Sequence, residues 1–256
     1  MRRNAQPTEF YEADNEFLDL VGLTPAIITW GHLSGRRVLL VEFAGCDLSC
    51  LGCDEDYTTG RRRVPTRTVV EAADSVSGGP PLRHRTDYAS YYKIPWVVLT
   101  GGEPLRQNIV PLVRLLNDRG YMVLLETNGA SRMPASLPPF VVVACSPKGS
   151  VHEDTKPHVR SLVYVAGEGE LADDGLPRAV LDLPDPVGRP WPEFLGPVFL
   201  CPRRTGDPDQ DRRNVRAVRA SCGEHGWLYM PPEPYIRLDA ADETVAVGGL
   251  HQSAGV

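Results

Sequence analysis

The sequence predicts an α/β fold in which about six parallel strands alternate with helices. Short apolar runs alternate along the chain with segments whose apolar residues recur at helical spacing. The runs are continuously apolar, as expected of strands covered on both faces of a sheet. Polar motifs directly follow four of the runs, where the carboxyl ends of parallel strands place functional groups. Such units form either an incomplete barrel or an open doubly wound sheet, and both carry their site at this edge.

The individual elements follow from these patterns. Strands are expected at residues 38–43, 95–100, 121–126, 140–145, 162–165 and 198–201. Helices are expected at residues 65–76, 108–119 and 211–222. The first helix has a threonine for its cap, and Gly120 ends the second. We expect a single domain over residues 1–256, with a polar arm at 1–20 and a Gly/Pro/Arg-rich inserted loop at 77–93.

Composition excludes several classes of function. The net charge of −6 provides no electrostatic footprint for DNA or RNA, so we expect no direct nucleic-acid partner. The basic run at residues 61–63 is more typical of a solvated loop. The sequence contains no apolar run long enough to span a membrane, and its polar beginning lacks the apolar core of a signal peptide. We therefore expect a cytoplasmic protein without a membrane partner.

The most informative segment is a cysteine loop that follows the first expected strand. Cys46, Cys50 and Cys53 are spaced C-x3-C-x2-C. Three thiolates are one too few for a closed structural zinc site. They suit a 4Fe–4S cluster that leaves one iron without a protein ligand. A zinc site completed by another cysteine or a histidine stays open, although no second C-x2-C or H-x3-H pair is visible.

Three further motifs end the next strands. The segment 100–104 reads TGGEP, where two glycines allow close approach of a ligand and Glu103 offers a carboxylate to an ammonium group. Glu126, in ETNG, could accept two hydroxyl hydrogen bonds, as a ribose requires. Ser146 and Lys148, in SPK, suit a carboxylate or a ribose edge. Each motif could instead be a simple turn or surface loop.

Taken together and in this order, the motifs resemble the 7-carboxy-7-deazaguanine synthase family of radical S-adenosylmethionine (SAM) enzymes. The resemblance covers residues 22–148 well, and the part from 200 to 256 has diverged. It implies a partial barrel, a 4Fe–4S cluster, SAM and a magnesium ion. It also implies a lyase-type enzyme that forms a homodimer and receives its electron from a flavodoxin-type or other donor. The implied reaction cleaves SAM to a 5′-deoxyadenosyl radical and converts 6-carboxy-5,6,7,8-tetrahydropterin, a pterin-like substrate, to 7-carboxy-7-deazaguanine, in 7-deazapurine biosynthesis.

The resemblance also assigns residues to roles. Cys46, Cys50 and Cys53 would bind the cluster. The residues that would contact SAM are Gly52, Asp54, Gly102, Glu103, Glu126, Ser146, Pro147 and Lys148. Thr100 would face the substrate, as would the side chains at the positions of Trp30 and Glu42. Glu55 stands where the family has its magnesium-binding threonine, and a carboxylate is a competent magnesium ligand.

The sequence departs from the family mainly on the substrate side. Trp30 lies in the segment that corresponds to the family's Q-G-E-G, and Glu42 replaces an arginine expected to pair with the substrate carboxylate. A glutamate there would repel a carboxylate unless it is protonated or paired. The Q-x-H-K segment near the end of the family's chains is absent, and Cys201-Pro202 stands for a Q-P segment.

These departures leave several hypotheses. The enzyme could act on a different, less anionic molecule, or Arg36, Arg37 or Arg237 could replace the missing arginine. The chain could also be a binding protein that kept the cluster and SAM without catalysis. Besides the enzyme and the binding protein, a third hypothesis is a zinc-stabilised α/β module without either function.

Overall fold

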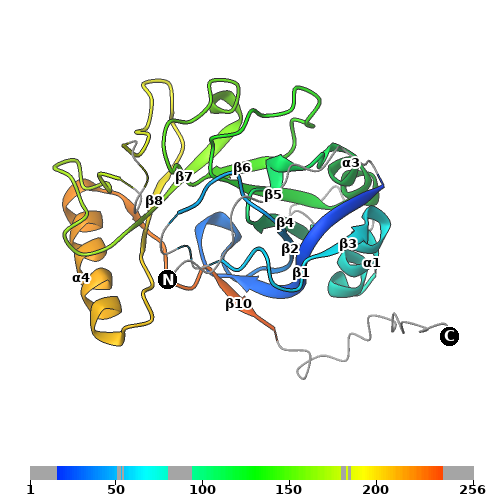
Figure 1. Cartoon of the computed structure of the whole chain (residues 1–256), viewed down its shortest axis with the longest axis horizontal. Helices are drawn as coiled ribbons and strands as arrows, with labels where there is room; N and C mark the ends of the chain where they lie inside the picture. The colour runs from blue at the N-terminus through cyan, green and yellow to red at the C-terminus, as the bar shows by residue number, and fades with distance from the viewer. Residues whose placement is uncertain are drawn as a thin grey trace.

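The computed structural model describes residues 16–50, 53, 55–79, 94–179, 183 and 186–238. Its centre is one mixed, mostly parallel sheet in the strand order β10-β1-β2-β4-β5-β6-β7-β8-β9, with β3 paired to β1 (Figure 1). Neighbouring strands from β2 to β9 pair in parallel. Because these strands run parallel, all of them present their carboxyl ends at one edge of the sheet.

All six predicted strands are confirmed. They are β2 (Arg37–Phe43), β4 (Trp96–Gly101), β5 (Met122–Thr127), β6 (Val142–Cys145), β7 (Val159–Ala166) and β8 (Val198–Pro202). Their side chains are almost all buried, in agreement with a sheet covered on both faces. A short strand that was not predicted, β9 (Leu228–Tyr229), extends the parallel part beyond β8.

The antiparallel edge of the sheet was missed from the sequence. It consists of β1 (Phe17–Ile28), β3 (Arg62–Pro65) and β10 (Tyr235–Arg237). The predicted polar arm is therefore wrong for residues 17–20, where Leu18 and Leu20 are buried and their neighbours are half-buried. Residues 1–15 lie outside the described residues.

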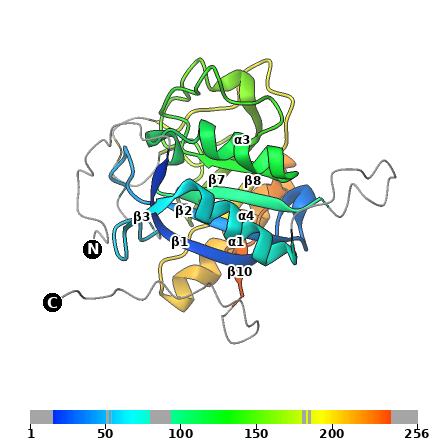
Figure 2. The same ribbon diagram turned by 90° about the vertical axis from the view of Figure 1, so that its right-hand side faces the viewer.

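In the described part of the chain, three α-helices pack on the sheet. The predicted helices are confirmed as α1 (Thr66–Ser77), α3 (Val110–Arg119) and α4 (Pro208–His225). Helices α1 and α3 lie together on one face, while α4 lies beside β8 at the far end of the sheet (Figures 1 and 2). The predicted threonine cap is wrong: Thr66 is already helical, and its hydroxyl donates to the carbonyl oxygen of Glu16 at 3.0 Å.

Short 3-10 turns occupy three of the connections. They are η1 (Gly31–Leu33), η2 (Pro104–Arg106) and η3 (Lys156–His158). Of the predicted inserted loop, Ser77 is the last residue of α1, Gly78 is its left-handed cap, and 80–93 lie outside the described residues. None of the helices in the described ranges combines the length and apolar character that crossing a bilayer requires.

Each face of the sheet has its own hydrophobic cluster. The larger cluster joins the sheet to α1 and α3. The smaller one lies on the opposite face and includes Ile28, Trp30, Leu40, Val98 and Phe199. Trp30 packs edge-on against Phe199, with ring centroids 5.2 Å apart. Two apolar clusters explain why the central strands are continuously apolar, and the smaller cluster ends below a cavity at the carboxyl edge.

Candidate active site

A cavity of about 250 Å³ lies at the carboxyl ends of β2, β4, β5, β6 and β8. The sequence-predicted residues that line it are Cys46, Cys50, Cys53, Glu42, Glu55, Thr100, Gly102, Glu126, Ser146 and Lys148. The fold therefore brings the cysteine loop and all three strand-end motifs to one place. Gly52 and Asp54 lie outside the described residues.

Three predicted site residues are not part of this lining. Trp30 lines a different cavity together with Phe199 and the early parts of the strands. Its side chain is buried in the smaller hydrophobic cluster, and its substrate role stays a prediction. Pro147 is buried beside the lining residues Ser146 and Lys148. Glu103 lies below the cavity, as described next.

The Glu103 carboxylate is buried and hydrogen-bonded within the protein. It has no exposed surface, and it accepts hydrogen bonds from the Leu105 N–H at 3.0 Å, the Thr127 hydroxyl at 2.9 Å and the Asn128 N–H at 2.7 Å. This carboxylate thus ties TGGEP to ETNG and caps η2. A carboxylate can accept about four hydrogen bonds, so the prediction that Glu103 binds the ammonium group of SAM stays a prediction.

The Glu103 carboxylate should make stability depend on pH. Burial raises its pKa to about 7, although the hydrogen bonds it accepts act in the opposite direction. The pKa of Glu103 is higher in the folded than in the unfolded protein. The stability that protonated Glu103 contributes is therefore fully present below the unfolded-state pKa, and it is lost as the pH rises to about 7. We expect the free energy of unfolding of the wild type, relative to Glu103→Gln, to fall by up to about 3 kcal/mol over that interval.

Urea unfolding of the two proteins at a series of pH values measures this difference. Glutamine is nearly isosteric and does not titrate, so the comparison isolates Glu103 from the other ionisable groups. Parallel pH profiles for the two proteins would show that Glu103 keeps an ordinary pKa.

The three cysteines of the loop line the cavity. Burial raises the pKa of Cys46 to about 12, and a bound metal would have to displace that proton. Within the described residues, no three cysteine, histidine or carboxylate side chains converge on a point where one ion could bind. In an iron–sulfur cluster each thiolate binds a different iron, so its ligands need not converge on one point. The donor set therefore fits a cluster better than a zinc ion.

Asp47 and Asn128 hold the cysteine loop against the end of β5. The Asn128 amide donates to Asp47 Oδ1 at 2.6 Å, and the Ser131 hydroxyl donates to Asp47 Oδ2 at 2.7 Å. Asn128 Oδ1 also accepts the Ala130 N–H at 2.8 Å, so the predicted turn is present as well. The contact between Asp47 and Asn128 was not predicted from the sequence, because the two residues lie about eighty residues apart in the chain.

The glycines of TGGEP are needed for the protein's own backbone. A Cβ atom on Gly102 would lie 1.9 Å from the Gly45 carbonyl oxygen, which is sterically impossible. The Gly102 N–H donates to the Phe43 carbonyl at 3.0 Å, and the Glu103 N–H to the Gly45 carbonyl at 2.9 Å. The predicted close approach is therefore made by the cysteine loop, which these bonds hold against the end of β4.

Glu126 accepts two hydroxyl hydrogen bonds from the protein itself, and its predicted role toward a ribose stays a prediction. One comes from Thr100 Oγ1 at 2.7 Å, and the other, a short one, from the hydroxyl of Tyr235 on β10. Burial raises the pKa of Glu126. A ribose at this carboxylate would have to share it with Thr100 and Tyr235. Sequence reasoning did not find Tyr235, which lies in the part of the chain that has diverged.

Basic side chains line the cavity near Cys50. The Lys148 ammonium donates to Ser146 Oγ at 2.8 Å, and both Lys148 and Arg203 lower the pKa of Cys50 against the larger, raising effect of burial. The Arg203 guanidinium forms an ion pair with Glu170 at 2.6 Å, and its Nε is buried without a hydrogen-bond partner. This end of the cavity suits an anionic group.

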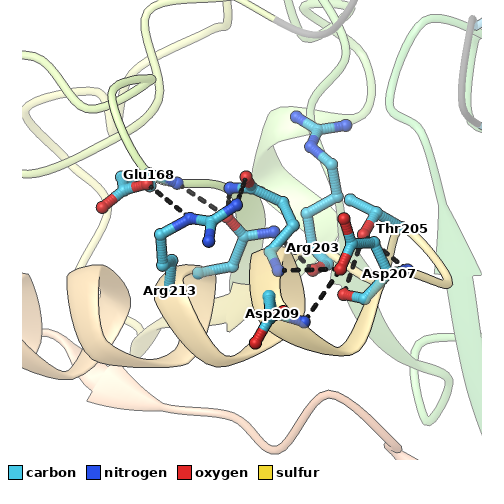
Figure 3. A network of polar contacts seen from close by, with 8 residues as sticks. Glu168, Arg203, Thr205, Asp207, Asp209 and Arg213 are labelled. Atoms are coloured by element: carbon cyan, nitrogen blue, oxygen red, sulfur yellow. Dashed lines mark hydrogen bonds and ion pairs between the residues drawn. The ribbon is translucent and has the colours of Figure 1, made fainter.

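A polar network fixes the backbone that carries Arg203 (Figure 3). The Asn214 amide, from α4, donates to the Arg203 carbonyl at 2.9 Å, and its oxygen accepts the Glu168 N–H at 2.9 Å. Asp207 caps α4 through the N–H groups of Asp209 and Gln210. The network joins the carboxyl ends of β7 and β8 to the start of α4.

Glu42 is paired, which removes the expected repulsion. Its carboxylate accepts a hydrogen bond from Thr24 at 2.7 Å and forms an ion pair with Arg237 of β10 at 2.6 Å. Of the arginines considered as replacements, Arg237 is the one that lines the cavity. A glutamate at this position is therefore not by itself a sign of a less anionic substrate.

Comparison with known proteins places this geometry in a family. No protein-family model matches the chain. The 7-carboxy-7-deazaguanine synthase of Rhodospirillum rubrum is 35% identical over 209 residues, 77% of this chain and 82% of that protein. The enzyme of the same name from Halobacterium salinarum is 30% identical, over 78% of this chain and 82% of that protein.

A solved structure shares the fold. QueE from Escherichia coli superposes with a TM-score of 0.57 at 15% identity and covers 84% of this chain and 93% of that one. The two sequence relatives extend over most of the chain, well beyond the cysteine loop. The chain therefore belongs to the 7-carboxy-7-deazaguanine synthase family of radical SAM enzymes, which use a 4Fe–4S cluster and SAM.

Proposed function

We propose that this protein converts 6-carboxy-5,6,7,8-tetrahydropterin to 7-carboxy-7-deazaguanine, as the names of its relatives indicate for them. The observation that carries the proposal is the single cavity lined by three cysteines and by the ends of three strands bearing TGGEP, ETNG and SPK. One bound electron donor, one cleavable cofactor and one small substrate require such a shared space.

In this proposal the chain's residues divide into two groups. Cys46, Cys50 and Cys53 hold the cluster, which when reduced supplies the electron that cleaves SAM to methionine and a 5′-deoxyadenosyl radical. The residues proposed to hold SAM are Gly52, Asp54, Gly102, Glu126, Ser146 and Lys148, with Pro147 shaping their loop. The apolar cluster below the cavity keeps water away from the reacting atoms.

The substrate is proposed to lie on the side of Glu42, Thr100 and Glu55. Thr100 already donates to Glu126, so it stands between the proposed ribose position and the rest of the cavity. Glu55 lines the cavity and takes the place of the family's magnesium-binding threonine. We propose it as the magnesium ligand, since a carboxylate oxygen is a ligand that magnesium prefers.

The proposal extends to architecture and setting. The sheet curves around the cavity as a partial barrel, within one domain spanning residues 1–256. The likeness to QueE over most of both chains supports the barrel. We further propose a homodimer, a flavodoxin-type or other small electron donor, and a cytoplasmic location, since reducing conditions protect an exposed cluster. The −6 net charge supports a small-molecule substrate over a nucleic acid.

The proposal is tested by anaerobic reconstitution with iron and sulfide, followed by incubation with SAM, dithionite and 6-carboxy-tetrahydropterin. We expect both 5′-deoxyadenosine and 7-carboxy-7-deazaguanine by mass spectrometry. Formation of 5′-deoxyadenosine alone would indicate that the radical chemistry is intact and that the enzyme acts on another substrate. Formation of neither product by fully reduced protein would overturn catalysis altogether.

A further inference from the structure

One ion pair in the cavity belongs to neither the cysteine loop nor the proposed SAM residues. Arg237 is on β10, opposite Ala26 of β1, and its Nη2 lies 2.6 Å from Glu42 Oε1. Its side chain is 51% exposed, whereas that of Glu42 is 9% exposed. Both residues line the cavity. The buried member therefore anchors the pair, and the guanidinium is the member that a ligand can reach.

The Glu42 carboxylate is held in a prepared position. Thr24 donates to its other oxygen, Oε2, at 2.7 Å, so both oxygens are engaged. A Cβ atom on Gly22 would lie 2.3 Å from Oε2, so the carboxylate fills space that only a glycine leaves open. A carboxylate fixed in this way holds one edge of the guanidinium. Among the described residues, Glu42 is the recorded hydrogen-bond partner of Arg237, and the other N–H groups remain to bind a ligand.

Four cationic side chains of the described residues line the cavity, and one of them, Arg204, is paired with Glu233 at 3.6 Å. The other three lie at two places. Lys148 and Arg203 lie near Cys50, whereas Arg237 lies near Glu42 and Glu55. Two carboxylates must be bound in the proposed reaction, one on the methionine part of SAM and one on the substrate. The first set of cations is beside the cluster ligands, where SAM must lie to be cleaved. The second is left for the substrate.

We infer that Arg237, anchored by Glu42, binds the substrate carboxylate and sets the preference for a carboxylated ring. A planar guanidinium with a free edge matches a carboxylate through paired hydrogen bonds. This inference rests on the proposed function and adds the residue that recognises its substrate class. Compared with the family pattern, the positive charge stands on the edge strand β10 instead of β2, and the buried glutamate on β2 supports it.

The inference is tested by equilibrium dialysis of the anaerobic holoenzyme with SAM, using 6-carboxypterin and pterin as probes. The wild type should prefer 6-carboxypterin, and Arg237→Gln should lower that preference by about tenfold or more. Binding of pterin, which has no carboxylate, should stay unchanged and so report that the variant is folded. Arg237→Lys keeps the charge but loses the fork, and we expect a loss between those of the wild type and the glutamine variant.

Arg204→Gln is the matched control. Arg204 also lines the cavity and forms a longer ion pair, with Glu233 at 3.6 Å. This variant therefore tests whether any cation of the cavity could bind the substrate carboxylate. Its preference should equal that of the wild type. An unchanged preference in Arg237→Gln would overturn the role of Arg237 alone. Failure of the wild type to bind 6-carboxypterin or to form the deazaguanine product would overturn the proposed function, and this inference with it.

Discussion

Cys50→Ser should abolish cluster assembly and SAM cleavage. Cys50 faces the cavity together with the other two thiols of the loop, and a serine hydroxyl is a poor ligand for iron. We expect the reconstituted wild type to hold about four irons per chain and the variant close to none. Iron and sulfide analysis, with 5′-deoxyadenosine formation as the second readout, measures both effects.

Cys222→Ser is the control for this experiment. Cys222 lies on α4, and it is not among the residues that line the cavity. This variant should keep wild-type iron content and SAM cleavage. A cluster that survives in Cys50→Ser, or iron lost equally from both variants, would contradict the assignment of the loop as the cluster ligand set. Stoichiometric zinc in the anaerobic protein would favour the zinc module.

Gly102→Ala should disconnect the cysteine loop from β4. The added Cβ would lie 1.9 Å from the Gly45 carbonyl oxygen, and backbone atoms cannot move aside as a flexible side chain can. We expect a loss of about 1–3 kcal/mol in the free energy of unfolding, as for other overpacked sites. We also expect SAM binding to fall by at least about tenfold, because displacement of the loop moves the cavity wall. Urea unfolding and equilibrium dialysis of SAM measure the two effects.

Gly223→Ala provides the matched control. Gly223 lies within α4, where an added Cβ meets no atom within 4 Å. Alanine there should stabilise the helix by about 0.5–1 kcal/mol and leave SAM binding unchanged. If Gly102→Ala behaved like this control, the close contact between TGGEP and the cysteine loop would not exist in solution.

Much of the fold could be predicted because the central strands are buried on both faces. Continuous apolar runs such as those of β2 and β4 need only their own residues to be recognised. Strand β1 was missed because it mixes buried and half-buried side chains and contains Pro25. Strand β10 has only three residues, and its pairing with β1 is what defines it.

The candidate site was predictable where a motif acts through its own residues. The cysteine loop and Glu126 are of this kind, since both line the same cavity at the strand ends. The protein donors of Glu103 were not predicted, because a sequence cannot show which groups surround a carboxylate. For Glu42 the sequence left repulsion and pairing open, because its partner, Arg237, lies 195 residues away in the chain. Both sets of contacts are made only by the tertiary fold.

The most direct test of a substrate site in this cavity follows a hydrogen atom from substrate to cofactor. Ring-deuterated 6-carboxy-tetrahydropterin would be incubated anaerobically with holoenzyme, SAM and dithionite, and the 5′-deoxyadenosine analysed by mass spectrometry. We expect substrate-dependent 5′-deoxyadenosine that is heavier by about one mass unit, because the radical takes its hydrogen from the bound ring. Unlabelled 5′-deoxyadenosine at saturating substrate would contradict the placement of this pterin beside the cluster and SAM.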